Sequence, residues 1–125
     1  MTVRVYLAGP EVFLANACEI GAQKRAICAR HGLIGVFPGD HEDGCDPALR
    51  PAERGLSISR AMERIMRGCD AMIVNLTPFR GPSADVGSTY EMGFMRAPAT
   101  CACGPRANAR ISMAWSSSHS ACTTT

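Results

Sequence analysis

The sequence predicts an α/β domain built on a parallel β-sheet. Three short apolar segments, each typical of a buried strand, alternate with three segments whose apolar residues recur at helical spacing. This alternation predicts parallel strands that are joined by right-handed helical crossovers. The loops at residues 9–13, 38–51 and 75–85 each follow a strand. We therefore expect a ligand to bind beyond the carboxyl ends of the strands.

Each expected strand is a run of apolar residues that ends at a loop signal. The first covers residues 3–8 and ends at Gly9-Pro10, and the second covers residues 33–37 and ends at Pro38-Gly39. The third covers residues 71–76 and leads into a loop that contains Pro and Gly. All three have the length of ordinary buried strands.

The expected helices fill the segments between the strands. The first ends at His31-Gly32, because Gly adopts the left-handed conformation that ends helices. The second carries an apolar stripe from Ile58 to Cys69, with charged residues on its other side. The third begins after Asp85, a residue type that favours the N-cap. Three cysteines fall on these stripes and are expected in the core: Cys18, Cys28 and Cys69.

Composition and charge exclude several classes of protein. The 125 residues correspond to one domain, and a hydrophobic content of 46% is that of a globular chain. No apolar run approaches the roughly 18 residues of a membrane span, and no secretory signal is legible at the start. We therefore expect a cytoplasmic protein with no membrane partner. The net charge of +2 is not clustered, so no nucleic-acid partner is expected either.

The composition changes after residue 97. Residues 98–125 contain no Asp, Glu, Val, Leu or Phe, and they are rich in Ser and Thr. Such a segment cannot bury enough apolar area to offset about 1–2 kcal/mol of backbone entropy per ordered residue. We therefore expect residues 1–97 to form the domain and residues 98–125 to be a low-complexity, disordered tail.

Two groups of residues contain metal-ligating types without the spacing of a known site. The pair Cys101 and Cys103 is closer together than the usual zinc pair, although His119 and Cys122 follow it. The acidic loop at residues 40–46 lacks the alternating ligands of a calcium loop. The sequence has seven cysteines, an odd number that argues against a disulfide framework. We expect neither a metal nor a cofactor.

The strongest candidate for chemistry is a pair of carboxylates at the start of the third helix. Asp85 stands at the N-cap, and Glu91 follows six residues later. Helical side chains lean toward the N-terminus, so we expect Glu91 over the turn that contains Gly87, which leaves room for a ligand. The helix N-terminus would help to keep both carboxylates ionised. From spacing alone, a plain cap and a solvated surface acid are the commoner interpretation.

Two segments resemble nucleoside 2-deoxyribosyltransferases. Residues 6–13, Tyr-Leu-Ala-Gly-Pro-Glu-Val-Phe, are similar to the opening strand and loop of that family, and residues 69–94 resemble the signature of its bacterial and trypanosomatid members. The resemblance spans about residues 3–97, and the C-terminal part does not match. It implies a flavodoxin-like, three-layer αβα fold, here truncated after the third βα unit.

The resemblance also implies a reaction that needs no cofactor. Glu91 matches the nucleophile that attacks C1′ of a 2′-deoxyribonucleoside, expels the base and forms a 2-deoxyribosyl ester, which a second free nucleobase then attacks. Tyr6 matches the tyrosine that donates a hydrogen bond to this nucleophile, and Asp85 matches the residue that binds the sugar 5′-hydroxyl. The family acts in nucleoside salvage on small molecules, as a homo-oligomer.

Five further residues complete the expected substrate site: Gly9, Pro10, Phe13, Asn75 and Gly87. Of these, Phe13 could stack on a base or serve only in packing, and the same two interpretations hold for Phe79. Asp85 favours nucleosides over nucleotides, because a carboxylate repels a 5′-phosphate.

Two departures from the family leave alternatives open. Met62 occupies the position at which family members carry an Asp or Asn near the leaving base, so no residue is assigned to protonate that base. Nothing after Ala97 resembles the family's C-terminal segment, as a shifted reading frame or altered terminus would produce. The alternatives are an N-glycosidic hydrolase of deoxynucleosides or their 5′-phosphates, and an inactive truncated member that at most binds a small ligand.

Overall fold

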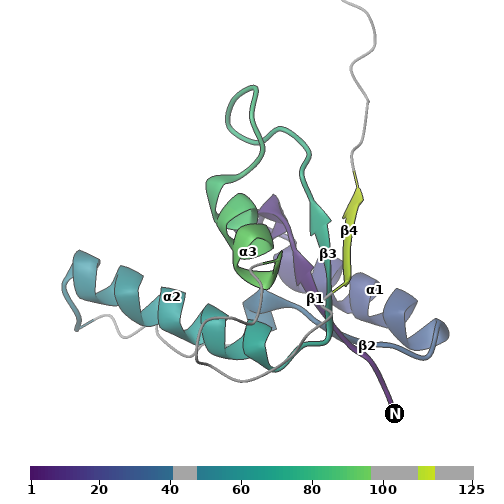
Figure 1. The fold of residues 1–125 in the computed structure, drawn as a ribbon. Coiled ribbons are helices and arrows are strands. Elements are labelled where there is room, and N and C mark those ends of the chain that lie inside the picture. Colours follow the sequence, from purple (N-terminus) through teal and green to yellow (C-terminus); the bar gives the residue numbers. More distant parts are fainter. Residues whose placement is uncertain (41–47, 97–109, 115–125) are drawn as a thin grey trace, which may run out of the picture.

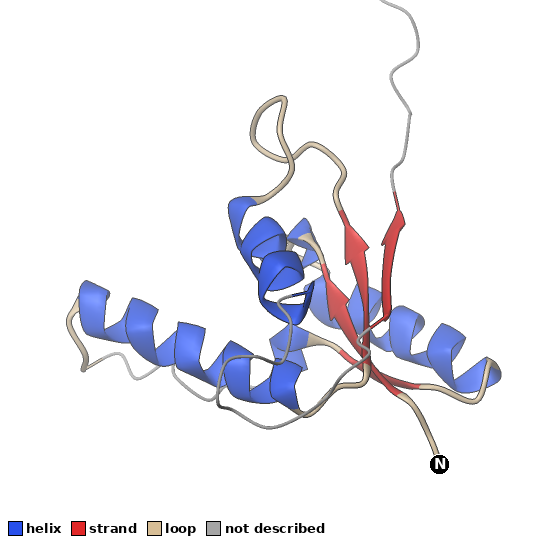
Figure 2. Cartoon of the chain, viewed as in Figure 1, coloured by secondary structure: helices blue, strands red, loops and turns tan. Residues whose placement is uncertain are grey.

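The computed structural model describes residues 1–40, 48–96 and 110–114, which contain four parallel strands and the helices that flank them (Figures 1 and 2). The strands are β1 (Arg4–Ala8), β2 (Ile34–Val36), β3 (Ala71–Asn75) and β4 (Arg110–Ala114). Their order across the sheet is β2-β1-β3-β4, and every neighbouring pair is parallel. This is the strand order of a flavodoxin-like sheet, so the fold class expected from the sequence is confirmed.

The sheet continues one strand beyond the third βα unit, where the sequence predicted its end. The backbone of β4 pairs with β3 from Ala71↔Arg110 to Asn75↔Ala114. A five-residue strand can form by pairing its backbone with the free N–H and C=O groups of a neighbouring strand. The composition of the segment does not indicate whether such a neighbour is present. The other residues of the expected tail, 98–109 and 115–125, lie outside the described residues.

Three helices cover the two faces of the sheet. They are α1 (Ala17–Arg30), α2 (Pro51–Arg67) and α3 (Val86–Arg96), and two 3₁₀ helices, η1 (Pro10–Phe13) and η2 (Pro38–Asp40), follow β1 and β2. Figure 1 shows α1 on one side of the sheet, with α2 and α3 on the other. None of the described helices has the length and apolar character that a membrane crossing requires.

The central strand β1 divides its side chains between two cores. Val5 and Leu7 pack on the α1 side, whereas Tyr6 and Ala8 pack on the side of α2 and α3. Successive side chains of a strand point to opposite faces, which accounts for the division. Tyr6 is fully buried in this arrangement, with its side chain on the face that α3 covers.

The expected core cysteines are confirmed in two cases out of three. Cys28 and Cys69 are buried, but Cys18 is exposed. The buried face of α1 runs through Ala17 and Gly21, and a helical residue lies about 100° around the axis from the one before it. Cys18 therefore points away from the sheet, which corrects the prediction.

Candidate active site

Tyr6 on β1 and Glu91 on α3 meet at the centre of the candidate site. The Tyr6 hydroxyl donates a hydrogen bond to Glu91 Oε1 at 2.7 Å. The tyrosine is fully buried and the glutamate is half-buried. The two residues are 85 positions apart, so the fold alone brings them together. Two residues that the sequence analysis assigned to the active centre are thus in direct contact.

Burial governs the acidity of both groups. Desolvation raises the pKa of Glu91, the hydrogen bond from Tyr6 lowers it, the charge of Asp85 raises it further, and the net shift is upward. The pKa of Tyr6 is also raised, first by burial and then by the negative charge and hydrogen bond of Glu91. We expected the helix N-terminus to favour the ionised glutamate, and the hydrogen bond from Tyr6 acts in the same direction. The loss of water around the carboxylate outweighs that effect.

Asp85 caps α3 as the sequence predicted. Its Oδ2 accepts a hydrogen bond from the Ser88 backbone N–H at 2.8 Å and another from the Ser88 hydroxyl at 3.0 Å. These bonds satisfy a backbone donor that the start of a helix leaves unpaired. Within the described part of the chain, no group donates a hydrogen bond to the second oxygen, Oδ1. Asp85 also lines the pocket.

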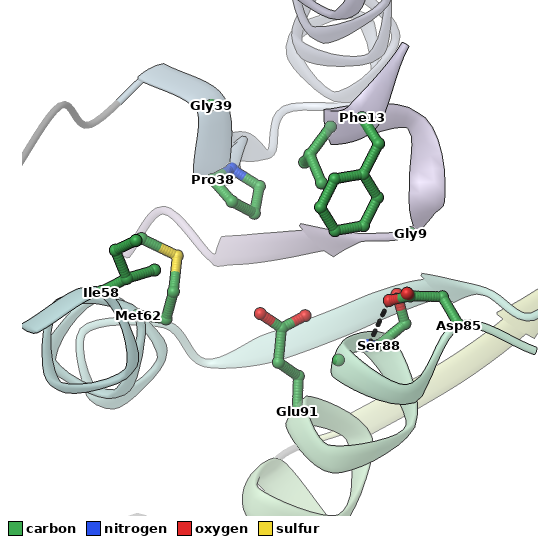
Figure 3. Close-up of a pocket in the computed structure, with 11 residues that line it drawn as sticks. Gly9, Phe13, Pro38, Gly39, Ile58, Met62, Asp85, Ser88 and Glu91 are labelled. Carbon is green, nitrogen blue, oxygen red and sulfur yellow. Dashed lines mark hydrogen bonds between the residues drawn. The ribbon is translucent and has the colours of Figure 1, made fainter. Parts of the chain in front are cut away.

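A pocket of about 740 Å³ lies in front of Glu91, at the carboxyl ends of β1, β2 and β3 (Figure 3). The loops that follow the strands were expected at this edge of the sheet. The wall consists of Gly9, Val12, Phe13, Pro38, Gly39, Ile58, Met62, Asp85, Gly87, Ser88 and Glu91. The volume falls within the roughly 300–1,000 Å³ that is usual for small-molecule sites.

Five of the expected site residues line this pocket, namely Gly9, Phe13, Asp85, Gly87 and Glu91. Gly87 also borders the Asp85 carboxylate. A Cβ added at this position would lie 3.2 Å from Asp85 Oδ2, so its missing side chain gives room to the Asp85 carboxylate.

Three of the expected site residues do not line the pocket, namely Tyr6, Pro10 and Asn75. Tyr6 lies beneath Glu91, and Pro10 is buried. The Asn75 amide donates to Glu11 Oε1 at 2.7 Å, and its carbonyl oxygen accepts from the Thr77 backbone N–H at 3.0 Å. Asn75 therefore ties the loop after β1 to the loop after β3.

Glu11 is a partly buried charge to which the sequence pattern assigned no role. Lys24 donates to Glu11 Oε1 at 2.8 Å, beside the bond from Asn75. Burial opposes ionisation of Glu11, but the hydrogen bonds from Lys24 and Asn75 prevail, and the pKa is lowered. The signal in the sequence was an acid in an otherwise apolar loop, Gly-Pro-Glu-Val-Phe.

The pocket wall also contains two residues of α2 that were expected in the core. Ile58 and Met62 belong to the apolar stripe of α2, which we expected to be core, yet both line the pocket. Met62 Sδ lies 3.7 Å from the Tyr6 hydroxyl. A stripe identified from its period does not reveal which of its members face an open space.

An aromatic stack borders the pocket at Phe13. The rings of Phe13 and Phe79 are stacked, with centroids 5.6 Å apart and planes 17° apart. The Arg80 guanidinium carbon lies 5.2 Å from the centroid of the first ring and 4.8 Å from that of the second. Phe79 therefore packs on Phe13. The four possible zinc ligands and residues 41–46 of the acidic loop lie outside the described residues.

Comparisons with known proteins point to one family. Residues 5–114 match the family model described as nucleoside 2-deoxyribosyltransferase. The match passes residue 97, where the resemblance was expected to end, and reaches the last residue of β4. An uncharacterized protein of Schizosaccharomyces pombe is 39% identical over 94 residues, which cover 74% of this chain and 44% of that protein.

A solved structure has a similar fold. The 2-desoxiribosyltransferase from Leishmania mexicana aligns with a TM-score of 0.57 and 28% sequence identity, over 74% of this chain and 57% of that one. The chain thus spans less than half of the yeast relative and little more than half of the Leishmania enzyme.

Proposed function

Because the chain belongs to the nucleoside 2-deoxyribosyltransferase family, we propose that it exchanges the base of a 2′-deoxyribonucleoside through a covalent ester on Glu91. The observation that carries the proposal is the 2.7 Å hydrogen bond from Tyr6 to Glu91 Oε1. This bond engages one oxygen of the carboxylate, while the Glu91 side chain borders the pocket (Figure 3). The second oxygen, Oε2, is the nucleophile in our proposal.

In the first step, Glu91 Oε2 attacks C1′ of the bound nucleoside. The new C1′–O bond forms as the C1′–N bond breaks, and the bond pair leaves with the base nitrogen. Burial favours this step, because it raises the pKa of Glu91 and thus makes the carboxylate a stronger base. The Tyr6 hydroxyl opposes full protonation of Glu91 and holds the carboxylate in one orientation.

In the second step, an incoming base that has lost its ring N–H proton to solvent attacks C1′ of the ester through that nitrogen. The C1′–O bond breaks, its electron pair returns to Glu91, and the carboxylate is restored. Two displacements at C1′ retain its configuration overall. Attack by water in place of the base would give free 2-deoxyribose, the outcome that defines the hydrolase alternative.

Asp85 anchors the sugar in this proposal. Its Oδ1 accepts a hydrogen bond from the 5′-hydroxyl, while Oδ2 remains bonded to Ser88. A 5′-phosphate would place like charges in contact at this end of the pocket, so nucleosides are preferred over nucleotides.

The other expected residues shape the wall around the substrate. Gly9 and Gly87 leave space for it, and Phe13 offers a ring against which a base can stack. Pro10 and Asn75 act from behind the wall by holding the loop after β1. The cytoplasmic location, the homo-oligomer and the role in nucleoside salvage stay predictions.

A base-exchange assay tests the proposal. The protein is incubated with thymidine, with and without free adenine, and the products are separated by liquid chromatography. We expect 2′-deoxyadenosine when adenine is present, and a 2-deoxyribosyl adduct on the intact protein by mass spectrometry. Glu91→Gln should abolish both, whereas Glu63→Gln, on the neighbouring helix, removes an acid outside the pocket wall and serves as the control.

Each contrary result has a distinct meaning. Equal amounts of free deoxyribose with and without adenine would identify a hydrolase. Absence of exchange, hydrolysis and adduct would identify an inactive member of the family.

A further inference from the structure

We infer that the pocket wall around Met62 restricts this site to nucleobases that leave and enter as stable anions. The inference rests on the proposed function and specifies its substrate class: 2′-deoxynucleosides whose base has an acidic ring N–H. It follows from the unequal distribution of polar groups on the two sides of Glu91.

The polar side chains of the pocket gather toward one end. In Figure 3 the Glu91 carboxylate lies between Asp85 and Ser88 on one side and Ile58 and Met62 on the other. With the sugar 5′-hydroxyl on Asp85 and C1′ at Glu91, the base extends toward Met62. The base therefore occupies the apolar end.

This apolar end has no described side chain that could protonate a leaving base. The side chains labelled on this side of Glu91 in Figure 3 are those of Pro38, Ile58 and Met62, and none of them carries an N–H, O–H or carboxyl group. The Met62 thioether, which faces Glu91 in Figure 3, can accept a hydrogen bond weakly but cannot donate one.

The Tyr6 hydroxyl is not a substitute for a general acid. Tyr6 lies 3.7 Å from Met62 Sδ, but it donates its proton to Glu91 Oε1 at 2.7 Å. It lies behind the pocket wall and is fully buried. Burial beside a carboxylate also raises the pKa of Tyr6, which makes its proton harder to release.

The chemistry of bond cleavage then sets the substrate class. When the C1′–N bond breaks, its electron pair stays on the base nitrogen, and a base that none of the described side chains protonates leaves as an anion. It takes a proton from water only after departure. The barrier therefore falls as the base N–H becomes more acidic. By microscopic reversibility, the acceptor base must enter as its anion, so the same preference governs both half-reactions.

A matched pair of substrates tests the inference. Thymidine and 5-bromo-2′-deoxyuridine carry 5-substituents of similar size, but bromine makes the base N–H more acidic. We expect kcat/KM for base release to be at least roughly tenfold higher for the bromo substrate, a difference that shape alone does not explain.

Variants at Met62 identify the cause. Met62→Asp introduces a carboxyl group beside Glu91. The negative charge of Glu91 favours the protonated form of the new aspartate, which can then donate a proton. Because general acids contribute about 10²–10⁴-fold, we expect the ratio between the two substrates to shrink by roughly tenfold or more. Met62→Leu keeps an apolar side chain of similar volume and should keep the wild-type ratio.

The outcomes separate the inference from the proposed function. Equal rates for the two substrates in the wild-type protein would overturn the inference and leave the transferase intact. The same ratio in Met62→Asp and Met62→Leu would also overturn it, provided that circular dichroism shows both variants folded. If neither substrate nor any other 2′-deoxynucleoside releases its base, the proposed function itself fails. The wild-type comparison remains decisive even if Met62→Asp does not fold.

Discussion

Asp85 caps α3, because its Oδ2 accepts a hydrogen bond from the Ser88 backbone N–H at 2.8 Å, and the same residue lines the pocket. One residue therefore serves both stability and the candidate site. Substitutions that differ in cap strength and in charge can separate these two roles.

Asp85→Asn should preserve the cap and weaken the site. Asn caps helices about as well as Asp, so we expect the free energy of unfolding to change by only a few tenths of a kcal/mol. Without its charge the residue binds the 5′-hydroxyl less well, and KM for the nucleoside should rise. Asp85→Ala should lose about 1 kcal/mol of stability in addition. Urea denaturation and steady-state kinetics measure the two effects; equal stability losses in both variants would contradict the separation.

Tyr6→Phe should move the pH dependence of base release. The Tyr6 hydrogen bond lowers the pKa of Glu91 against the effect of burial, so its removal raises that pKa further. Glu91 must be ionised to attack C1′, and the acid limb of kcat/KM against pH should therefore shift to higher pH. Glu63→Gln, which removes the charge from the acceptor of the exposed Tyr90 hydroxyl, is the matched control and should leave the limb in place. An unmoved limb in Tyr6→Phe would show that Glu91 is not the titrating group.

Glu91→Gln should stabilise the protein at neutral pH. Burial makes the folded-state pKa of Glu91 higher than its value in the unfolded chain, so ionisation of this residue destabilises the fold. The penalty is absent below the unfolded pKa, grows as the pH rises toward the folded pKa, and is constant above it. The difference in unfolding free energy between variant and wild type should follow this course in urea titrations at several pH values. A difference that shrinks as the pH rises would have the wrong sign.

Gly21→Ala and Gly55→Ala should have opposite effects on stability. A Cβ at Gly21 would lie 2.6 Å from the ring of Phe37, which is fully buried, whereas a Cβ at Gly55 meets nothing within 4 Å. We expect the first variant to lose about 1–3 kcal/mol through overpacking. The second should gain about 0.5–1 kcal/mol from helix propensity. Thermal denaturation followed by circular dichroism gives both values, and a stabilised Gly21→Ala would refute the close packing of α1 on Phe37.

The sequence was informative wherever the relevant signal is local. The alternation of strands and helices predicts the parallel sheet, and the positions of Asp85 and Glu91 on one helix predict the cap and the carboxylate over the pocket. The contact between Tyr6 and Glu91 was expected only from the family resemblance, because no local pattern joins residues so far apart in the chain.

The remaining differences arise from tertiary arrangement. Met62 belongs to a stripe that is partly core and partly pocket wall, and only the placement of α2 against β1 decides which part is open. Asn75 sits in a segment typical of substrate contact, yet its amide bonds to Glu11. The strand at Arg110–Ala114 depends on pairing with β3, a partner that lies far away in the sequence.

The direction of β4 has a practical consequence for work with this protein. Because β4 runs parallel to β3, its last residue, Ala114, pairs with Asn75 at the edge of the sheet that holds the pocket. Met1 precedes β1 and is fully exposed, so it lies toward the opposite edge. An affinity tag or fluorophore fused ahead of Met1 would therefore lie away from the pocket.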